Sequence, residues 1–388
     1  MFENQITTSR NVLVVLQKEM NAETRYLTDH FCGEVVYSLA EVPEGKRIYV
    51  CGDVSGIHDT SFLVIKELSD NYEGHGTLIT LGEVPIVISK AGVFFRKFFP
   101  EDDYFNRIKS EHAFQELTES NKPSKALRKG IYLTNITRDE KEVLHYRLLR
   151  CSSNLTGPTD NFRTTDHKII NALNEAVKYV FEEKTELNHV LAQIYENKIT
   201  GEKEVKSRIK AHSDKTKDMP KEGLIVFCTF YDGTDLDQFK VPDTDRYDRC
   251  HKKVSAFTKL HFKLKNTVED ASLDKEFSVT LYPNSVFMIP LSTNRLYTHE
   301  IRPSVLGADV IPTRLGYVVR CSNMEAQYMD KQVYIKENGE LIKLELMTED
   351  GQYDLKGSYY EENISEKSIQ YGKVHFSMNA GDYEKPIY

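Results

Sequence analysis

Hydrophobic and polar positions follow two different periods along this chain. Between residues 165 and 181 apolar side chains recur every three or four positions, which predicts an amphipathic helix of about five turns that begins at Thr165 as its N-cap. The apolar face of this helix consists of Ile169, Ile170, Leu173, Ala176, Val177, Val180 and Phe181. Elsewhere the apolar runs are short and end at Gly, Pro, Asp or Asn, which is typical of β-strands.

The strand-like runs after this helix predict the fold class. They cover residues 190–195, 224–230, 277–282, 285–291 and 314–321. Because no helical period lies between them, we expect an antiparallel sandwich or jelly roll and not a parallel α/β sheet. The charged segment 232–275 has little apolar period, so we expect an insertion loop that carries little of the core.

The two ends of the chain predict extensions to this part. Residues 1–88 alternate apolar runs with Gly, Asp and Pro, which predicts an N-terminal α/β extension of short strands and one or two helices. Residues 329–388 predict a small β-rich extension with hairpin turns at Asn338-Gly339 and Asp350-Gly351. The central domain is then 89–328.

An aromatic and basic stretch at residues 92–135 opens the central domain. Two interpretations fit it: a flap that contacts a substrate, or aromatic packing at a domain edge.

Composition restricts the class of protein. The chain has 388 residues and a formal net charge of −8, so its surface as a whole does not favour nucleic acid. A local basic segment, residues 198–221, has eight Lys and Arg against four Asp and Glu, and its simplest interpretation is a solvated loop. No apolar run approaches the roughly 20 residues that cross a membrane. The first residues lack a secretory pattern, and the six cysteines form no CxxC pair, so we expect free thiols and a cytoplasmic or nuclear location.

A candidate metal site begins at His212-Ser213-Asp214. Residues two apart in an extended chain point the same way, so His212 and Asp214 can bind one ion. Non-haem iron oxygenases use two His and one carboxylate and keep the remaining positions open. No other histidine of the chain has an acidic residue two positions later, and His299, at the end of a later strand-like run, is the candidate third ligand.

Two arginines on one later strand predict an anion site. Arg314, Gly316 and Arg320 share one face at a period of two, and the small Gly316 leaves room between the two charges. Unpaired buried guanidinium groups are costly, so we expect a buried dianion between them. The two carboxylates of 2-oxoglutarate fit this role.

The order of these residues resembles the AlkB-type branch of the 2-oxoglutarate/Fe(II)-dependent dioxygenases. The similarity covers residues 187–325 and rests on Tyr195, the His212-Ser213-Asp214 motif, His299 and the Arg314/Arg320 pair with its spacing of six. It implies a double-stranded β-helix (jelly-roll) core with flanking helices, in an α+β, mainly β protein. The family has Asn two residues before the Tyr, where this chain has Gln193.

The resemblance also implies roles for these residues. His212, Asp214 and His299 would hold Fe(II), Arg314 would pair with the distal carboxylate of 2-oxoglutarate, and Arg320 would lie near its iron-bound end. Tyr195 would hydrogen-bond the co-substrate, with Gln193 beside it. The reaction would consume O₂ and hydroxylate or oxidatively demethylate a substrate.

The substrate class stays open. A nucleic-acid base that is single-stranded or flipped out of its stack is one hypothesis, with Phe94, Phe95, Tyr104 and Phe105 as candidates to stack on it. A protein side chain or a small metabolite is the second. A non-catalytic jelly-roll interaction module is the third, and a zinc hydrolase would leave both arginines unexplained. We expect no membrane partner, and the sequence does not indicate an oligomeric state.

Overall fold

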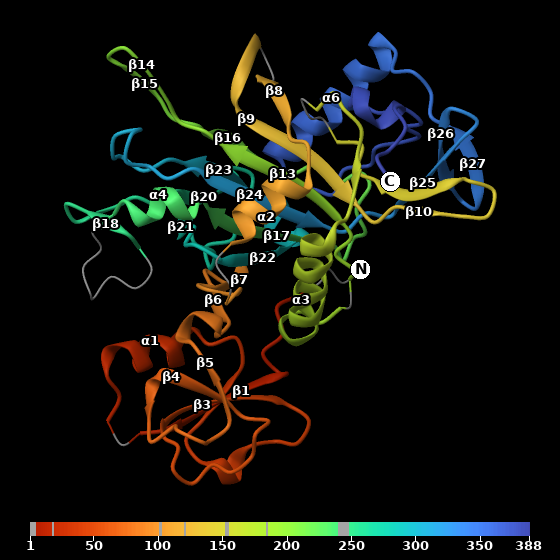
Figure 1. Ribbon diagram of the computed structural model, residues 1–388. Helices are drawn as coiled ribbons and strands as arrows, with labels where there is room; N and C mark the ends of the chain where they lie inside the picture. The colour runs from red at the N-terminus through yellow and green to blue at the C-terminus, as the bar shows by residue number, and fades with distance from the viewer. Residues whose placement is uncertain are drawn as a thin grey trace.

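The computed structural model describes residues 5–17, 19–100, 103–119, 122–151, 155–183, 185–239 and 248–388. The fold is α+β and rich in β-structure, with an N-terminal unit set apart from a larger body (Figure 1). No helix in these residues is both long and apolar enough to span a membrane.

The N-terminal unit is built on a five-stranded parallel sheet in the order β2-β1-β3-β4-β5. Its elements are β1 (Asn11–Leu16), α1 (Ala22–His30), β2 (Glu34–Val36), η1 (Leu39–Glu41), β3 (Arg47–Asp53), β4 (Leu63–Asp70), β5 (Thr77–Ile79) and η2 (Leu81–Glu83). The apolar run of β1 is explained by burial on both faces, as is usual in parallel sheets: Leu13 and Val14 belong to different core clusters.

The largest sheet of the body has nine strands. Their order is β12 (Asp160–Asn161), β9 (Lys122–Thr134), β13 (His189–Tyr195), β24 (Arg314–Arg320), β17 (Leu224–Tyr231), β22 (Val286–Pro290), β7 (Gly92–Phe95) and β6 (Ile86–Ile88), with β8 (Gln115–Glu119) paired to β9. Alternate residues of each strand face opposite sides. One face packs on the helices α2 (Tyr104–Glu111) and α3 (Thr164–Val180), and the other faces a second sheet.

The second sheet is antiparallel and has four strands. Their order is β16 (Ile209–His212), β23 (Tyr297–Arg302), β20 (Lys259–Leu264) and β21 (Glu276–Thr280). Phe262 of β20 contacts Phe287 of β22 edge to face, with ring centroids 5.7 Å apart. The two sheets therefore share one apolar core, and the candidate site lies in the space between them.

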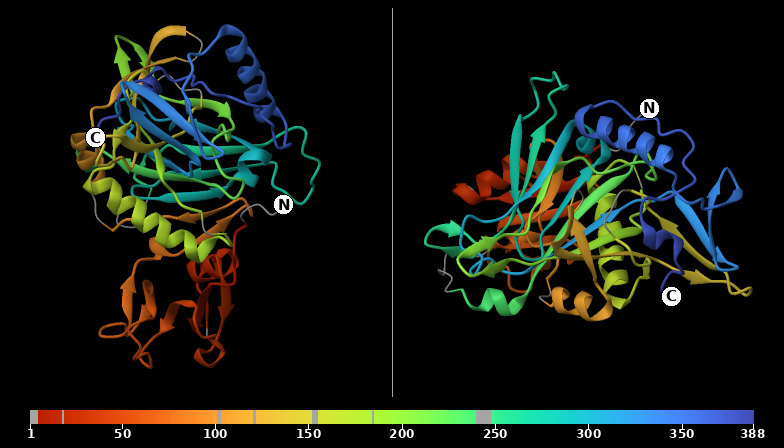
Figure 2. Two further views of the ribbon diagram at one scale, coloured as in Figure 1. Left: turned by 90° about the vertical axis from the view of Figure 1, so that its right-hand side faces the viewer. Right: turned by 90° about the horizontal axis from the view of Figure 1, so that it is seen from above.

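The remaining elements surround these two sheets. A third sheet contains β10 (Thr137–Arg138), β11 (Leu144–Leu148), β25 (Met324–Met329), β26 (Gln332–Glu337) and β27 (Glu340–Lys343). The others are the hairpins β14 (Lys198–Thr200)–β15 (Lys203–Val205) and β18 (Cys250–His251)–β19 (Val254–Ser255), with α4 (Gly233–Asp237), α5 (Leu291–Leu296), α6 (Glu349–Ile364) and η3 (Ala380–Tyr383). Figure 2 shows α6 along the outside of the body, away from the N-terminal unit.

The five strands expected after the helix are confirmed as β13, β17, β21, β22 and β24, and the apolar face of α3 is buried as expected. The start of α3 was placed wrongly, because its N-cap is Arg163. Asp166 accepts the Arg163 backbone N–H at 2.7 Å, and the Thr165 hydroxyl donates to Glu111 at 2.8 Å instead of capping the helix.

Three further expectations are wrong. Segment 232–275, apart from residues 240–247, which lie outside the described residues, is not only an insertion loop. Its strand β20 buries Leu260 and Phe262, because apolar and polar residues alternate there. Asp350-Gly351 begins α6 instead of forming a hairpin turn, since the Thr348 side chain caps this helix. The basic segment 198–221 contains the β14–β15 hairpin and is not a plain loop.

The aromatic residues proposed to stack on a base belong to the core. Phe94, Phe95, Tyr104 and Phe105 are buried, and Phe99, Tyr104 and Phe230 form an aromatic cluster beneath α2. These side chains cannot receive a substrate, so aromatic packing is the correct interpretation of this part of residues 92–135. Residues 101–102 and 120–121 of that stretch lie outside the described residues.

A buried histidine joins α2 to α3 and predicts a pH dependence. His112 contacts Asp160 through Nδ1 and Asp166 through Nε2, both at 2.8 Å. Burial by itself lowers the pKa of His112, but the two carboxylates outweigh it and raise this pKa to about 9. Protonated His112 therefore stabilises the fold fully below pH 6.5, the value in an unfolded chain, and this contribution is lost as the pH rises through 9.

We expect the stability difference between the wild type and His112→Gln to shrink by about 3 kcal/mol between pH 6 and pH 10. Urea unfolding at both pH values measures it. A difference that stays constant over this range would contradict the charged His112 cluster.

Candidate metal centre

Three side chains from the second sheet and its adjoining loop converge on one point. His212 ends β16 and lies opposite His299 of β23 in the strand pairing. Asp214 Oδ1 is 3.5 Å from His212 Nε2 and 3.7 Å from His299 Nε2. The three side chains offer ligand atoms that all lie within 4.8 Å of one another, so this triad could bind a metal ion.

The protonation states suit metal binding. His212 Nδ1 lies 2.8 Å from the Lys210 carbonyl oxygen, which can only accept, so Nδ1 carries the proton and Nε2 presents its lone pair. Burial, and next the neighbouring His212, lower the pKa of His299 to about 3, so this ring is neutral at pH 7. Burial acts to raise the pKa of Asp214, but the buried Arg320 guanidinium holds it well below its usual range. Two imidazoles and one carboxylate are a suitable ligand set for Fe(II).

Arg320 already has a partner. Its Nε and Nη2 contact Asp214 Oδ2 at 2.8 and 2.6 Å, which leaves Oδ1 facing the two histidines. Both residues are buried. Burial acts to lower the pKa of Arg320, but Asp214, together with Cys151 and Tyr132, raises it above its usual value. A buried dianion was expected between the two arginines to balance both charges, but Asp214 already balances Arg320. The sequence does not reveal this pair, because the loop that carries Asp214 reaches Arg320 only in the folded chain.

Arg314 differs from Arg320 in its surroundings. Its side chain is buried, 4% exposed, and no carboxylate pairs with it in the part of the chain that the structure describes. Nε and Nη2 have no hydrogen-bond partner among these residues, and the guanidinium group lies 3.9 Å from the centre of the Tyr195 ring. Stacking on an aromatic ring offsets part of the cost of burying a cation but leaves its N–H donors unsatisfied. Arg314 is thus a buried cation whose Nε and Nη2 have no acceptor among the described residues.

Gly316 separates the two arginines. A Cβ atom there would lie 2.8 Å from Arg314 Nη1 and 3.1 Å from the Tyr195 ring, so the Arg314 guanidinium leans back over Gly316 toward the triad. Across the neighbouring strands, Gly316 pairs with Gln193 of β13 and Thr229 of β17. The middle of the cavity is therefore lined by one small and two polar residues.

The polar residues beside Gly316 have different environments. The Tyr195 hydroxyl donates to Gln193 Oε1 at 3.1 Å. Thr229 Oγ1 is buried without a partner in the described residues and was missed by the sequence analysis. Its only sequence signal is its polar character in a strand that is otherwise apolar.

The structure brings the candidate residues around one cavity of about 70 Å³ between the two sheets. These residues are Gln193, Tyr195, His212, Asp214, His299, Arg314 and Arg320, and Gly316, Val318 and Thr229 line the same space. The triad and Arg320 lie together, and Arg314 and Tyr195 lie further along β24 and β13.

Three supporting residues were also missed. Asn294 of α5 accepts the Asp214 backbone N–H at 2.8 Å and donates to the Asp214 carbonyl at 2.9 Å, which fixes the backbone of this ligand. Phe262 lies on one side of the His299 ring and Phe227 meets it edge to face, with centroids 5.6 and 5.4 Å away. His299 Nδ1 is buried with no partner among the described residues.

Comparison with known proteins adds little to this geometry. No protein-family model matches the chain, and no curated protein matches it. The solved structure of OsALKBH1 aligns with 60% of this chain and 96% of its own length, at 13% sequence identity and a TM-score of 0.34. A similarity this low carries no argument about function.

Proposed function

We propose that this chain is an Fe(II)- and 2-oxoglutarate-dependent dioxygenase of the AlkB type. The observation that carries the proposal is Arg314, a buried cation with unsatisfied donors in the same cavity as a His-Asp-His triad. A buried cation of this kind is costly unless an anion binds it. A zinc hydrolase would need the triad but not Arg314. A non-catalytic module would need neither the triad as a metal site nor a buried Arg314 without a partner.

The arrangement of strands supports a double-stranded β-helix. Apart from the two small hairpins, the chain from β13 to β24 forms eight strands: β13, β16, β17, β20, β21, β22, β23 and β24. Successive strands lie alternately in the larger and the smaller sheet, except that β20 and β21 both lie in the smaller one. Strands β13-β24-β17-β22 of the larger sheet face strands β16-β23-β20-β21 of the smaller sheet. The first strand, β13, and the last strand, β24, are therefore neighbours in the larger sheet. This closure brings His212, His299 and Arg314 into one interior although they are distant in sequence.

Each residue then has a definite role. His212, Asp214 and His299 would hold the iron, and Arg314 would bind the distal carboxylate of 2-oxoglutarate in the bidentate manner typical of arginine. Arg320 keeps Asp214 ionised, and its Nη1 is a further buried donor without a partner in the described residues, available to the other end of the co-substrate. When bound, iron supplies the activation of O₂ that converts 2-oxoglutarate to succinate and CO₂ while a substrate C–H becomes C–OH.

Anaerobic titration of metal-free protein with Fe(II) and 2-oxoglutarate tests this proposal. We expect a weak visible charge-transfer band that is absent in His212→Ala and in Arg314→Ala. His251→Ala, a change at an exposed histidine, is the matched control and keeps the band. A folded wild-type protein that gives no band would favour the non-catalytic module.

A smaller change in the cavity separates co-substrate binding from metal binding. In Gly316→Ala the new methyl group would displace the Arg314 guanidinium, because the two would lie 2.8 Å apart. We expect 2-oxoglutarate to bind about tenfold more weakly, because roughly one charge-assisted hydrogen bond is lost. Affinity for Mn(II) alone is expected to stay unchanged. Calorimetric titration of each ligand measures both, and equal affinities for 2-oxoglutarate would contradict the position assigned to Arg314.

For the substrate, we propose a nucleic acid carrying a modified base. A surface groove shares Ile209 and Ile301 with the cavity. It is also lined by Arg208, Lys210, Pro303 and the ion pair of Arg302 with Glu300. Exposed basic side chains beside a site favour a polyanion. Oxidation of a methyl group on nitrogen would release formaldehyde. The protein-substrate hypothesis predicts turnover of methylated peptides instead, so parallel assays with methylated oligonucleotides and peptides distinguish the two, and binding of oligonucleotides should weaken as salt rises.

A further inference from the structure

The loop that carries Asp214 is held by the C-terminal helix α6. Ser213, between the two metal ligands, donates its backbone N–H to Asn363 Oδ1 at 2.7 Å. The Asn363 side chain is fixed in turn, because its Nδ2 donates to the Tyr359 carbonyl at 3.1 Å. One side chain of α6 therefore sets the direction of the peptide that joins His212 to Asp214.

A second contact lies one residue earlier in α6. Glu362 is buried, 3% exposed, and its Oε1 accepts the Thr216 backbone N–H at 3.1 Å as well as the Thr216 hydroxyl. Its Oε2 accepts the Tyr371 hydroxyl. A buried carboxylate whose oxygens accept these groups is a rigid support, because moving it would leave several polar groups unsatisfied.

Two lysines tie the helix to the body around this contact. Lys215 donates to the Tyr359 carbonyl at 3.0 Å. Lys265, just after β20, donates to the carbonyls of Glu362 and Ser365 at 2.6 and 3.0 Å, which fixes the C-terminal end of α6. The helix is therefore anchored beside both the Asp214 loop and the second sheet.

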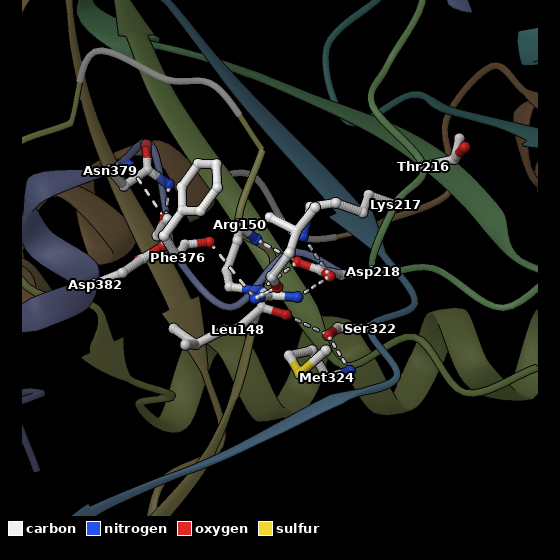
Figure 3. Close-up of polar contacts among 12 residues, drawn as sticks. Leu148, Arg150, Thr216, Lys217, Asp218, Ser322, Met324, Phe376, Asn379 and Asp382 are labelled. Carbon is white, nitrogen blue, oxygen red and sulfur yellow. Dashed lines mark hydrogen bonds and ion pairs between the residues drawn. The ribbon is translucent and has the colours of Figure 1, made fainter. Parts of the chain in front are cut away.

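The far end of the loop is held by a buried ion pair (Figure 3). Arg150 binds both oxygens of Asp218, with Nη2 to Oδ1 at 2.9 Å and Nε to Oδ2 at 3.2 Å, and Lys217 contacts Asp218 Oδ1 at 2.7 Å. Arg150 Nη1 also donates to the Val374 carbonyl at 2.5 Å, beyond α6. The C-terminal segment thus supports residues 213–218 from both ends.

We propose that α6 is part of the metal centre and that Asn363 and Glu362 are positioning residues for Asp214. This inference rests on the proposed metal site. The ligand triad spans a strand end and a loop, and only the loop can move without breaking a sheet. Contacts that orient ligands commonly change metal affinity by roughly 10–100-fold when removed. The C-terminal extension then has a role in catalysis without touching substrate.

Variants of α6 in the full-length chain test this role. Asn363→Leu keeps the size of the side chain but removes the acceptor for Ser213. Glu362→Met removes the acceptor for Thr216, whereas Glu362→Gln keeps an oxygen there. Tyr360→Ala is the matched control, because Tyr360 is on the same helix and 64% exposed. Co(II) is the probe, since its visible spectrum reports both affinity and coordination geometry, and hydrogen exchange of the 213–216 amides is measured without metal.

We expect Asn363→Leu and Glu362→Met to bind Co(II) at least tenfold more weakly, with an altered spectrum and faster exchange of these amides. Glu362→Gln and Tyr360→Ala are expected to match the wild type. Equal affinity, spectrum and exchange in all variants would overturn the role of α6. Faster exchange in a protein whose wild type binds no Co(II) would overturn the proposed metal site while keeping the contact of α6 with the loop. If Asn363→Leu and Glu362→Met both fail to fold, Glu362→Gln decides the question. Weak Co(II) binding by Glu362→Gln would overturn the positioning role, because this variant keeps the acceptor for Thr216 and should bind Co(II) as the wild type does.

Discussion

Asp214→Ala is expected to abolish metal binding and to lower the free energy of unfolding by about 3–5 kcal/mol. The first effect follows from losing the one carboxylate of the triad. The second follows from Arg320, whose Nε and Nη2 both contact Asp214 and which is 7% exposed, because the substitution leaves a buried charge without its partner. Urea unfolding and Co(II) titration of the same preparation measure the two effects.

A double variant separates the two consequences. In Asp214→Ala/Arg320→Met the unpaired charge is removed as well, and replacing a whole buried ion pair by apolar groups is often neutral. We therefore expect stability to return to within about 1–2 kcal/mol of the wild type while Co(II) binding stays absent. A double variant as unstable as the single one would mean that the ion pair is not the reason for the destabilisation.

Arg314→Met is expected to have effects of opposite sign on stability and on co-substrate binding. Without a bound anion, Arg314 has no ion-pair partner among the described residues, so its removal should leave stability unchanged or raise it by about 1 kcal/mol. Affinity for 2-oxoglutarate should fall about 100-fold or more, because the substitution removes a bidentate charge-assisted contact worth roughly 3 kcal/mol of binding free energy. Thermal unfolding without ligand and titration of the Mn(II)-loaded protein with 2-oxoglutarate provide the measurements.

The matched control for this prediction is Arg302→Met. Arg302 lies on the neighbouring sheet, its side chain is 52% exposed, and it pairs with Glu300 outside the cavity. We expect it to bind 2-oxoglutarate as the wild type does. A marked loss of stability in Arg314→Met would show that the guanidinium has a structural partner and would count against an anion site.

Much of the fold could be predicted because burial leaves a pattern along the chain. Strands β13, β17, β22 and β24 are buried on both faces, so their sequences are nearly continuous apolar runs. Strands of the second sheet were harder to predict, because one face is exposed and the runs are short. In β16, Ile209 and His212 are partly buried, and the two residues between them, Lys210 and Ala211, are exposed. In β20 the alternation was present but lay inside a charged segment.

Sequence reasoning was sufficient for the candidate residue types and for their relation along single strands. The even spacing from Arg314 to Arg320 places these side chains on one face of β24 through local geometry alone. His212 and Asp214 also converge as expected, although β16 ends at His212 and Asp214 lies in the following loop. Whether an arginine lacks a partner was not predictable. Arg320 is paired by a carboxylate 106 residues away and Arg314 is not, because that choice depends on where the 213–218 loop lies.

The C-terminal part of the chain gives the clearest case in which tertiary structure decided the outcome. The hairpin expected at Asn338-Gly339 is confirmed by the pairing of β26 with β27. At Asp350-Gly351, Thr348 as N-cap and the Asp350 carboxylate in the first turn favour a helix instead, and α6 then lies against the candidate metal centre. The pattern of α6 itself contains no sign of this role, since Asn363 and Glu362 are ordinary polar residues in a polar helix. Their contacts with Ser213 and Thr216 exist only because the folded chain brings residues about 150 positions apart within hydrogen-bond distance.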